Sequence, residues 1–188
     1  MSTRRNLITT IGTVAAVGVS GCMGDGNSTD SNSNSSSGNG GGNQNLTDSE
    51  KLLQKYKQAY DHHLKGLEHF KKAFEAYDNG NHAEAQSQFK KAEDDYRLAV
   101  NDYGPNAIGD LAGRVFEGDS EEWPAAHSDS LDNMMFGYRK AVLAVRIYKN
   151  AGSDYNDLNH DGIEEVRLGY DKGRYAMGDV EKMRQALP

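Results

Sequence analysis

Residues 47–104 read TDSEKLLQKYKQAYDHHLKGLEHFKKAFEAYDNGNHAEAQSQFKKAEDDYRLAVNDYG and contain two apolar stripes with helical spacing. Apolar and aromatic residues recur at alternating intervals of three and four, which places them on one face of an α-helix. The first stripe consists of Leu53, Tyr56, Tyr60, His63, Leu67, Phe70, Phe74 and Tyr77. The second consists of Ala85, Phe89, Ala92, Tyr96, Ala99 and Tyr103.

Capping residues mark the ends of these two helices. Thr47 followed by Glu50 is a capping box, in which each side chain satisfies a free backbone amide of the first turn. Gly80 favours the end of the first helix and Asn81 the start of the second, and Gly104 with its following proline ends the second. The short turn between them predicts an antiparallel helical hairpin.

The pattern extends toward the C-terminus. Residues 104–120 predict a short helix that closes one end of the core, residues 123–152 a third long helix, and residues 161–187 a fourth. The apolar stripe of the third long helix is predicted to be Leu131, Met134, Tyr138, Ala141, Val145 and Tyr148. No run alternates with the period of a strand, so residues 47–188 predict an all-α antiparallel four-helix bundle.

Residues 73–92 resemble the core of one tetratricopeptide repeat. The resemblance rests on Ala73, Gly80, Ala85, Phe89 and Ala92. It implies a role in binding a peptide or a partner protein. The first helix is longer than in that repeat and the later helices do not repeat the pattern, so a generic helical hairpin is the alternative.

The N-terminal residues have the pattern of an export signal. Arg4 and Arg5 precede an apolar stretch that is too short and too weak to span a bilayer, and Cys22 follows Val-Ser-Gly as in a lipobox. Residues 1–21 are therefore predicted to be a twin-arginine lipoprotein signal peptide. Cys22 is therefore predicted to carry a lipid. Because it is the only cysteine in the sequence, an intramolecular disulfide is excluded.

Residues 22–46 are predicted to be a lipidated cysteine followed by a disordered tether. This segment is rich in Gly, Ser and Asn and has too little apolar surface to offset the entropy of ordering. It contains three Asn-x-Ser/Thr sequons, which are candidate glycosylation sites at Asn27, Asn34 and Asn45.

Signal, lipobox and tether together resemble the secreted lipoproteins of haloarchaea. The resemblance implies export of a folded protein and an extracytoplasmic domain that is anchored in the cell membrane through the lipid on Cys22. Without Arg4 and Arg5 the chain has 19 basic and 28 acidic residues, because the full sequence has 21 and 28. This acidic balance argues against a nucleic-acid partner.

Residues 157–162, Asp-Leu-Asn-His-Asp-Gly, resemble the start of a calcium loop. The predicted oxygen ligands are Asp157, Asn159, Asp161 and Glu165. Leu168 stands where a bidentate acid belongs in such loops. The alternative is a turn that caps the fourth helix through Asp161.

Four histidines, His62, His63, His69 and His82, cluster around the predicted hairpin without metal-ligand spacing. His62 and His69 lie two turns apart, and His63 belongs to the apolar stripe. No catalytic or cofactor motif is present, so no enzyme activity and no cofactor are predicted. The sequence favours a membrane-anchored domain that binds or scaffolds a ligand it does not identify, either another exported protein or a small molecule. The alternatives are a calcium-binding or calcium-stabilised surface protein and a hydrolase or metal enzyme of an unrecognised type.

Overall fold

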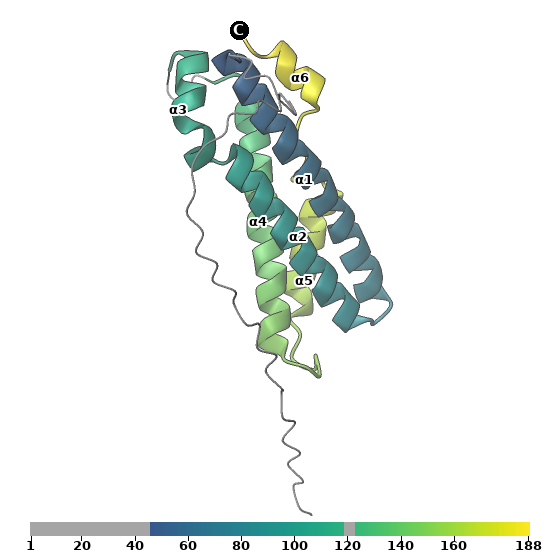
Figure 1. Cartoon of the computed structure of the whole chain (residues 1–188). Coiled ribbons are helices and arrows are strands. Elements are labelled where there is room, and N and C mark those ends of the chain that lie inside the picture. Colours follow the sequence, from purple (N-terminus) through teal and green to yellow (C-terminus); the bar gives the residue numbers. More distant parts are fainter. Residues whose placement is uncertain (1–45, 119–122) are drawn as a thin grey trace, which may run out of the picture. The chain divides into compact units, whose positions relative to one another are not determined.

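The computed structural model describes residues 46–118 and 123–188, and in these two ranges all regular secondary structure is helical (Figure 1). The helices are α1 Asp48–Asp78, α2 His82–Tyr103, α3 Pro105–Phe116, α4 Ala125–Ala151, α5 His160–Asp171 and α6 Val180–Gln185. The prediction of an all-α bundle is therefore confirmed.

The bundle is built on the hairpin of α1 and α2, which run antiparallel and share the largest helix–helix contact. Helix α4 packs against α2 and runs antiparallel to it (Figure 1). Helix α5 packs against α4 and α1 and runs antiparallel to α4. The short helices α3 and α6 lie at the end of the bundle where α1 begins, and α3 occupies the position predicted for the closing helix.

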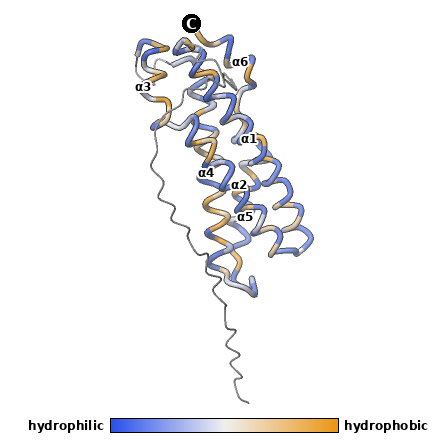
Figure 2. Tube along the Cα trace, in the orientation of Figure 1, coloured by the Kyte–Doolittle hydropathy of each residue, from blue (hydrophilic) through white to orange (hydrophobic). Residues whose placement is uncertain are grey.

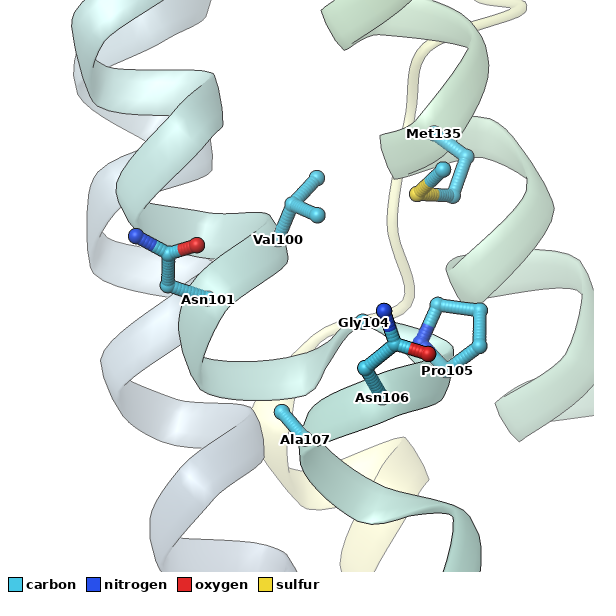
Figure 3. Close-up of a pocket in the computed structure, with 7 residues that line it drawn as sticks. All are labelled: Val100, Asn101, Gly104, Pro105, Asn106, Ala107 and Met135. Carbon is cyan, nitrogen blue, oxygen red and sulfur yellow. The ribbon is translucent and has the colours of Figure 1, made fainter.

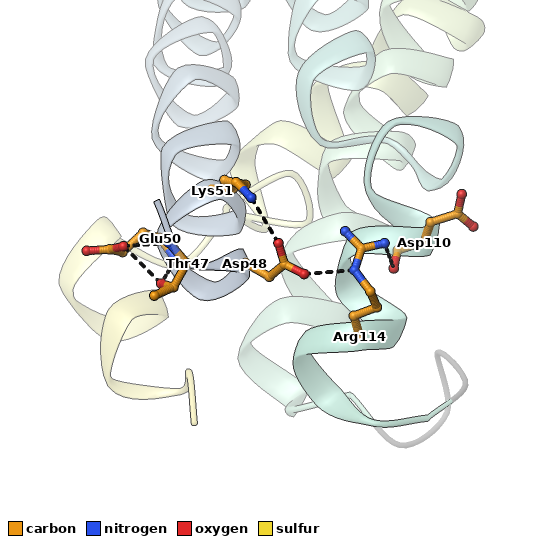
Figure 4. Close-up of polar contacts among 6 residues, drawn as sticks. All are labelled: Thr47, Asp48, Glu50, Lys51, Asp110 and Arg114. Carbon is orange, nitrogen blue, oxygen red and sulfur yellow. Dashed lines mark hydrogen bonds and ion pairs between the residues drawn. The ribbon is translucent and has the colours of Figure 1, made fainter. Parts of the chain in front are cut away.

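Helix α1 begins with the predicted capping box (Figure 4). The Glu50 amide donates to Thr47 Oγ1 at 3.2 Å, and the Thr47 amide donates to Glu50 Oε2 at 2.8 Å. One residue later, Asp48 Oδ2 accepts from Arg114 Nε at 2.7 Å. Because Arg114 lies near the end of α3, this ion pair holds α3 against the start of α1.

The prediction of one helix over residues 161–187 was wrong. Helix α5 ends at Asp171, Gly173 follows with φ of +64°, and α6 starts only at Val180. The physical reason is Tyr175, whose buried ring folds back onto Gly169 and whose hydroxyl donates to the Val166 carbonyl at 2.8 Å. A continuing helix would carry this side chain away from that contact.

The middle of the core is organised around Tyr96. A Cβ atom at Gly66 of α1 would lie 2.7 Å from the Tyr96 ring, and one at Gly137 of α4 would lie 2.6 Å from it. The two glycines therefore let α1 and α4 approach opposite sides of one aromatic ring on α2. The Tyr96 hydroxyl and the neighbouring His63 Nδ1 are buried and have no hydrogen-bond partner among the described residues.

Candidate functional site

Buried polar groups hold the C-terminal segment to the bundle. His127 Nε2 donates to the Met183 carbonyl at 3.3 Å, and the Tyr103 hydroxyl donates to His127 Nδ1. This arrangement needs a neutral imidazole, and burial accordingly lowers the pKa of His127 to about 4.

A second set of contacts lies beside the first. The Tyr56 hydroxyl donates to the Gly178 carbonyl, and the Gly178 amide donates to Ser130 Oγ at 3.0 Å. Burial raises the pKa of Tyr56 to about 12. The side chains of Tyr56 and Ser130 are both buried and both hydrogen-bonded to the backbone of Gly178, so they attach this part of the C-terminal segment to the bundle.

A carboxylate that no sequence motif singles out lies between two of the histidines. Asp95 of α2 contacts His62 Nδ1 through Oδ1 at 3.3 Å and His69 Nε2 through Oδ2 at 3.5 Å. His69 Nδ1 also lies 2.7 Å from the Gln88 amide oxygen. The two rings meet different oxygens of one carboxylate, so they connect α1 to α2 without converging on a common point.

The fourth histidine of the sequence analysis lies elsewhere. His82, at the hairpin end of the bundle, packs among Tyr77, Tyr148, Tyr155 and His160, whose Nδ1 lies 2.6 Å from the Tyr77 hydroxyl. In the described part of the chain no three His, Cys, Asp or Glu side chains form a group that fits a metal ion.

The four predicted calcium ligands are spread over a loop and the first turns of α5. Asn159 Oδ1 accepts from the Gly162 amide at 3.0 Å and caps α5, so Asn159 and not Asp161 has the capping role. Glu165 pairs with Lys140 of α4, which holds its pKa below the usual range. Asp157 precedes the helix and Asp161 lies in its first turn. Calcium binding stays a prediction.

The predicted export, lipid and glycosylation positions lie outside the described residues. They are Arg4, Arg5, Cys22, Asn27, Asn34 and Asn45. Among the helices that the structure describes, none combines the length and the apolar character needed to cross a membrane.

A concave surface lies between α3 and α4. A cavity of about 570 Å³ is lined on one side by Gly109 and Gly113 of α3 and on the other by Leu131 and Asp132 of α4, with Trp123 nearby. A Cβ atom at Gly109 would meet nothing within 4 Å, so α3 presents bare backbone to this space.

Two further cavities continue this surface around Pro105, which lines all three. One, of about 320 Å³, lies between Val100 of α2 and Met135 of α4 (Figure 3). The other, of about 470 Å³, extends along α4 to Phe136 and Arg139. We call the three cavities together the α3–α4 groove.

Beyond the groove, α4 carries further apolar side chains that its own bundle buries only in part, and Figure 2 shows apolar residues along this helix. The helix buries one face, which includes Met134, Ala141 and Tyr148. Five other apolar side chains, spaced four, three, four and three residues apart, stay partly exposed. We call them the outer stripe: Leu131, Met135, Tyr138, Val142 and Val145.

Three residues of the outer stripe also belong to the predicted buried face of this helix. Leu131, Tyr138 and Val145 pack against the hydrophobic core, as predicted, but each is only partly buried, and a neighbouring shallow pocket is lined by Tyr138, Val142 and Arg146. Within the described residues, the main helix contacts of α4 are with α2 and α5, neither of which covers the outer stripe completely.

Comparison with known protein families, with curated proteins and with solved structures finds no match for this chain.

Proposed function

We propose that this protein is an exported, lipid-anchored binding module whose binding surface is the α3–α4 groove and the adjoining outer stripe. The observation that carries the proposal is the partly exposed apolar side of α4. Helix α4 is apolar over a wide arc, and the part of that arc that α2 and α5 leave partly exposed is available to a second partner.

The shape of the groove suits a protein segment. Trp123 and Leu131 offer large apolar contacts, and the glycines of α3 allow a backbone to approach closely. Large apolar residues in a recess and a polar rim are the usual composition of a protein-binding site. Asp132 and Arg139 provide that rim, and both are exposed.

The N-terminal residues support the location of this activity. Export by the twin-arginine signal at Arg4 and Arg5 would deliver the folded bundle, and a lipid on Cys22 would hold it at the outer face of the membrane. A flexible coil of about 25 residues, the length of the predicted tether, has a mean span of roughly 25–30 Å, which would leave the groove free to reach a neighbouring exported protein.

The test is affinity capture of the tagged protein from cross-linked native membranes, in four forms. The wild type is compared with Cys22→Ser, with Met135→Arg in the outer stripe, and with Leu64→Arg as the matched control. Leu64 is a large hydrophobic residue of α1 with 47% exposure, so this control changes an exposed leucine away from the groove.

We expect one set of partners with the wild type and with Leu64→Arg, and its loss with Met135→Arg. Cys22→Ser should reduce capture from membranes and retain binding to an added purified partner. Capture that is equal for Met135→Arg and the wild type would refute the assignment of the binding surface.

A further inference from the structure

The outer stripe of α4 has a periodicity that defines what fits it. Its residues 131, 135, 138, 142 and 145 follow a heptad pattern over about 21 Å of helix, at 1.5 Å per residue. A heptad stripe packs best on another helix with the same spacing, since side chains of one enter spaces between those of the other.

The stripe is also symmetric about its centre. Tyr138 stands seven residues from both Leu131 and Val145, and nearly midway between Met135 and Val142. In an antiparallel pair of identical helices centred on Tyr138, Leu131 is level with Val145 of the second copy, and Met135 lies within about 1.5 Å along the axis of Val142 of the second copy. A surface that matches itself in this way satisfies the requirement of a two-fold interface.

The charges beside the stripe are arranged in the same way. Asp132, Arg139 and Arg146 are seven residues apart, so they lie on one side of α4, and all three are exposed. Among the described residues none of them has an ion-pair partner within the chain, whereas Lys140 and Glu165 at the opposite edge of the helix are paired.

A two-fold antiparallel arrangement brings this flank against the same flank of the second copy in reverse order. Asp132 of one copy then lies between the levels of Arg139 and Arg146 of the other, about 3 Å along the axis from Arg146. The two Arg139 side chains approach each other near the symmetry axis, with one Asp132 carboxylate on each side of them. In a parallel two-fold pair the same flank of the two copies would lie on opposite sides of the interface, so these charges would not meet.

We propose that the outer stripe binds a second copy of this chain, and that α4 pairs with its equivalent in an antiparallel two-fold dimer centred on Tyr138. The inference rests on the proposed function and names the partner of that same surface. Such a dimer would carry two lipids on its two Cys22 residues. One acyl chain gives only reversible membrane attachment and two give stable attachment, so pairing would strengthen anchoring.

The first experiment measures the mass of the full chain by light scattering, with Cys22→Ser to exclude disulfide artefacts. The expected mass is twice that of the 20.6 kDa chain. Asp132→Arg should weaken association by about tenfold, because it places like charges together twice per dimer. The double variant Asp132→Arg with Arg146→Asp should restore association, and Asp61→Arg on α1 is the control.

The second experiment determines the orientation by disulfide formation between single cysteines in the Cys22→Ser background. Tyr138→Cys should form a disulfide-linked dimer, because the two positions meet at the symmetry axis. Leu131→Cys should not link to itself, because its equivalents lie about 21 Å apart along the axis, but it should link to Val145→Cys in a mixture. Helix content measured by circular dichroism checks that each variant is folded.

A monomeric mass at micromolar concentration, or self-linking of Leu131→Cys equal to that of Tyr138→Cys, would overturn the dimer. These outcomes test the dimer and do not by themselves test the proposed function. A monomeric chain that still captures a partner, and loses it with Met135→Arg, would leave the binding module in place and refute the second copy as its occupant.

Discussion

Replacing Gly137 by alanine should destabilise the bundle by about 1–2 kcal/mol, although alanine is the better helix former. The new Cβ atom would lie 2.6 Å from Cε1 of Tyr96, well inside van der Waals contact. The ring cannot retreat, because Gly66 of α1 lies against its other side, where a Cβ atom would be 2.7 Å from Cε2. Overpacking of this kind costs roughly 1–3 kcal/mol, and the gain in helix propensity offsets up to about 1 kcal/mol.

The assay is urea unfolding followed by circular dichroism for the wild type, Gly137→Ala and Gly109→Ala. The three proteins are compared with the same dependence of the unfolding free energy on urea concentration. Gly109 is the matched control because it also lies inside a helix, while its added Cβ atom meets nothing within 4 Å. Gly109→Ala should therefore stabilise the protein by about 0.5–1 kcal/mol. If Gly137→Ala proves as stabilising as Gly109→Ala, the packing of α1 and α4 on Tyr96 is wrong.

Three further predictions concern the polar contacts. Burial lowers the pKa of His63 and of His127 to about 4, so as the pH falls below 6.5 the unfolded chain takes up protons before the folded chain does. The free energy of unfolding should therefore drop by about 2–3 kcal/mol per histidine by pH 4.5. Urea unfolding of His63→Phe at pH 7 and at pH 4.5 should show roughly half of the loss that the wild type shows. Asn159→Ala should cost about 1 kcal/mol in thermal or urea unfolding, because it removes the cap of α5, and a cost that grows with added calcium would contradict a purely capping role. Arg167→Lys should cost about 1 kcal/mol, because lysine cannot form the paired hydrogen bonds to Asp78 at 2.6 and 2.9 Å; equal stability of the two proteins would show that solvent already weakens this contact.

The sequence by itself determined the helical hairpin and the class of fold. Thr47 with Glu50 at one end, and Gly80 with Asn81 at the turn, act on backbone groups within three or four residues along the chain. Such interactions depend on neighbours in sequence, so their residue types and spacing are sufficient to predict them.

Only the tertiary structure decided where the last long helix breaks and which histidines meet Asp95. Gly173 lies in a stretch whose apolar periodicity continues toward residue 187, so the pattern favoured one helix. The break follows from the contact of Tyr175 with Gly169, and the His62–Asp95–His69 contacts join two helices.

The candidate binding surface also depended on the tertiary structure. Met134 and Met135 are adjacent and of one residue type, yet the first is fully buried and the second lines the α3–α4 groove. A helix that is apolar over a wide arc has more than one face that satisfies the same period. The sequence shows that these faces are apolar. Only the packing of α2 and α5 determines which of them stays accessible to a partner.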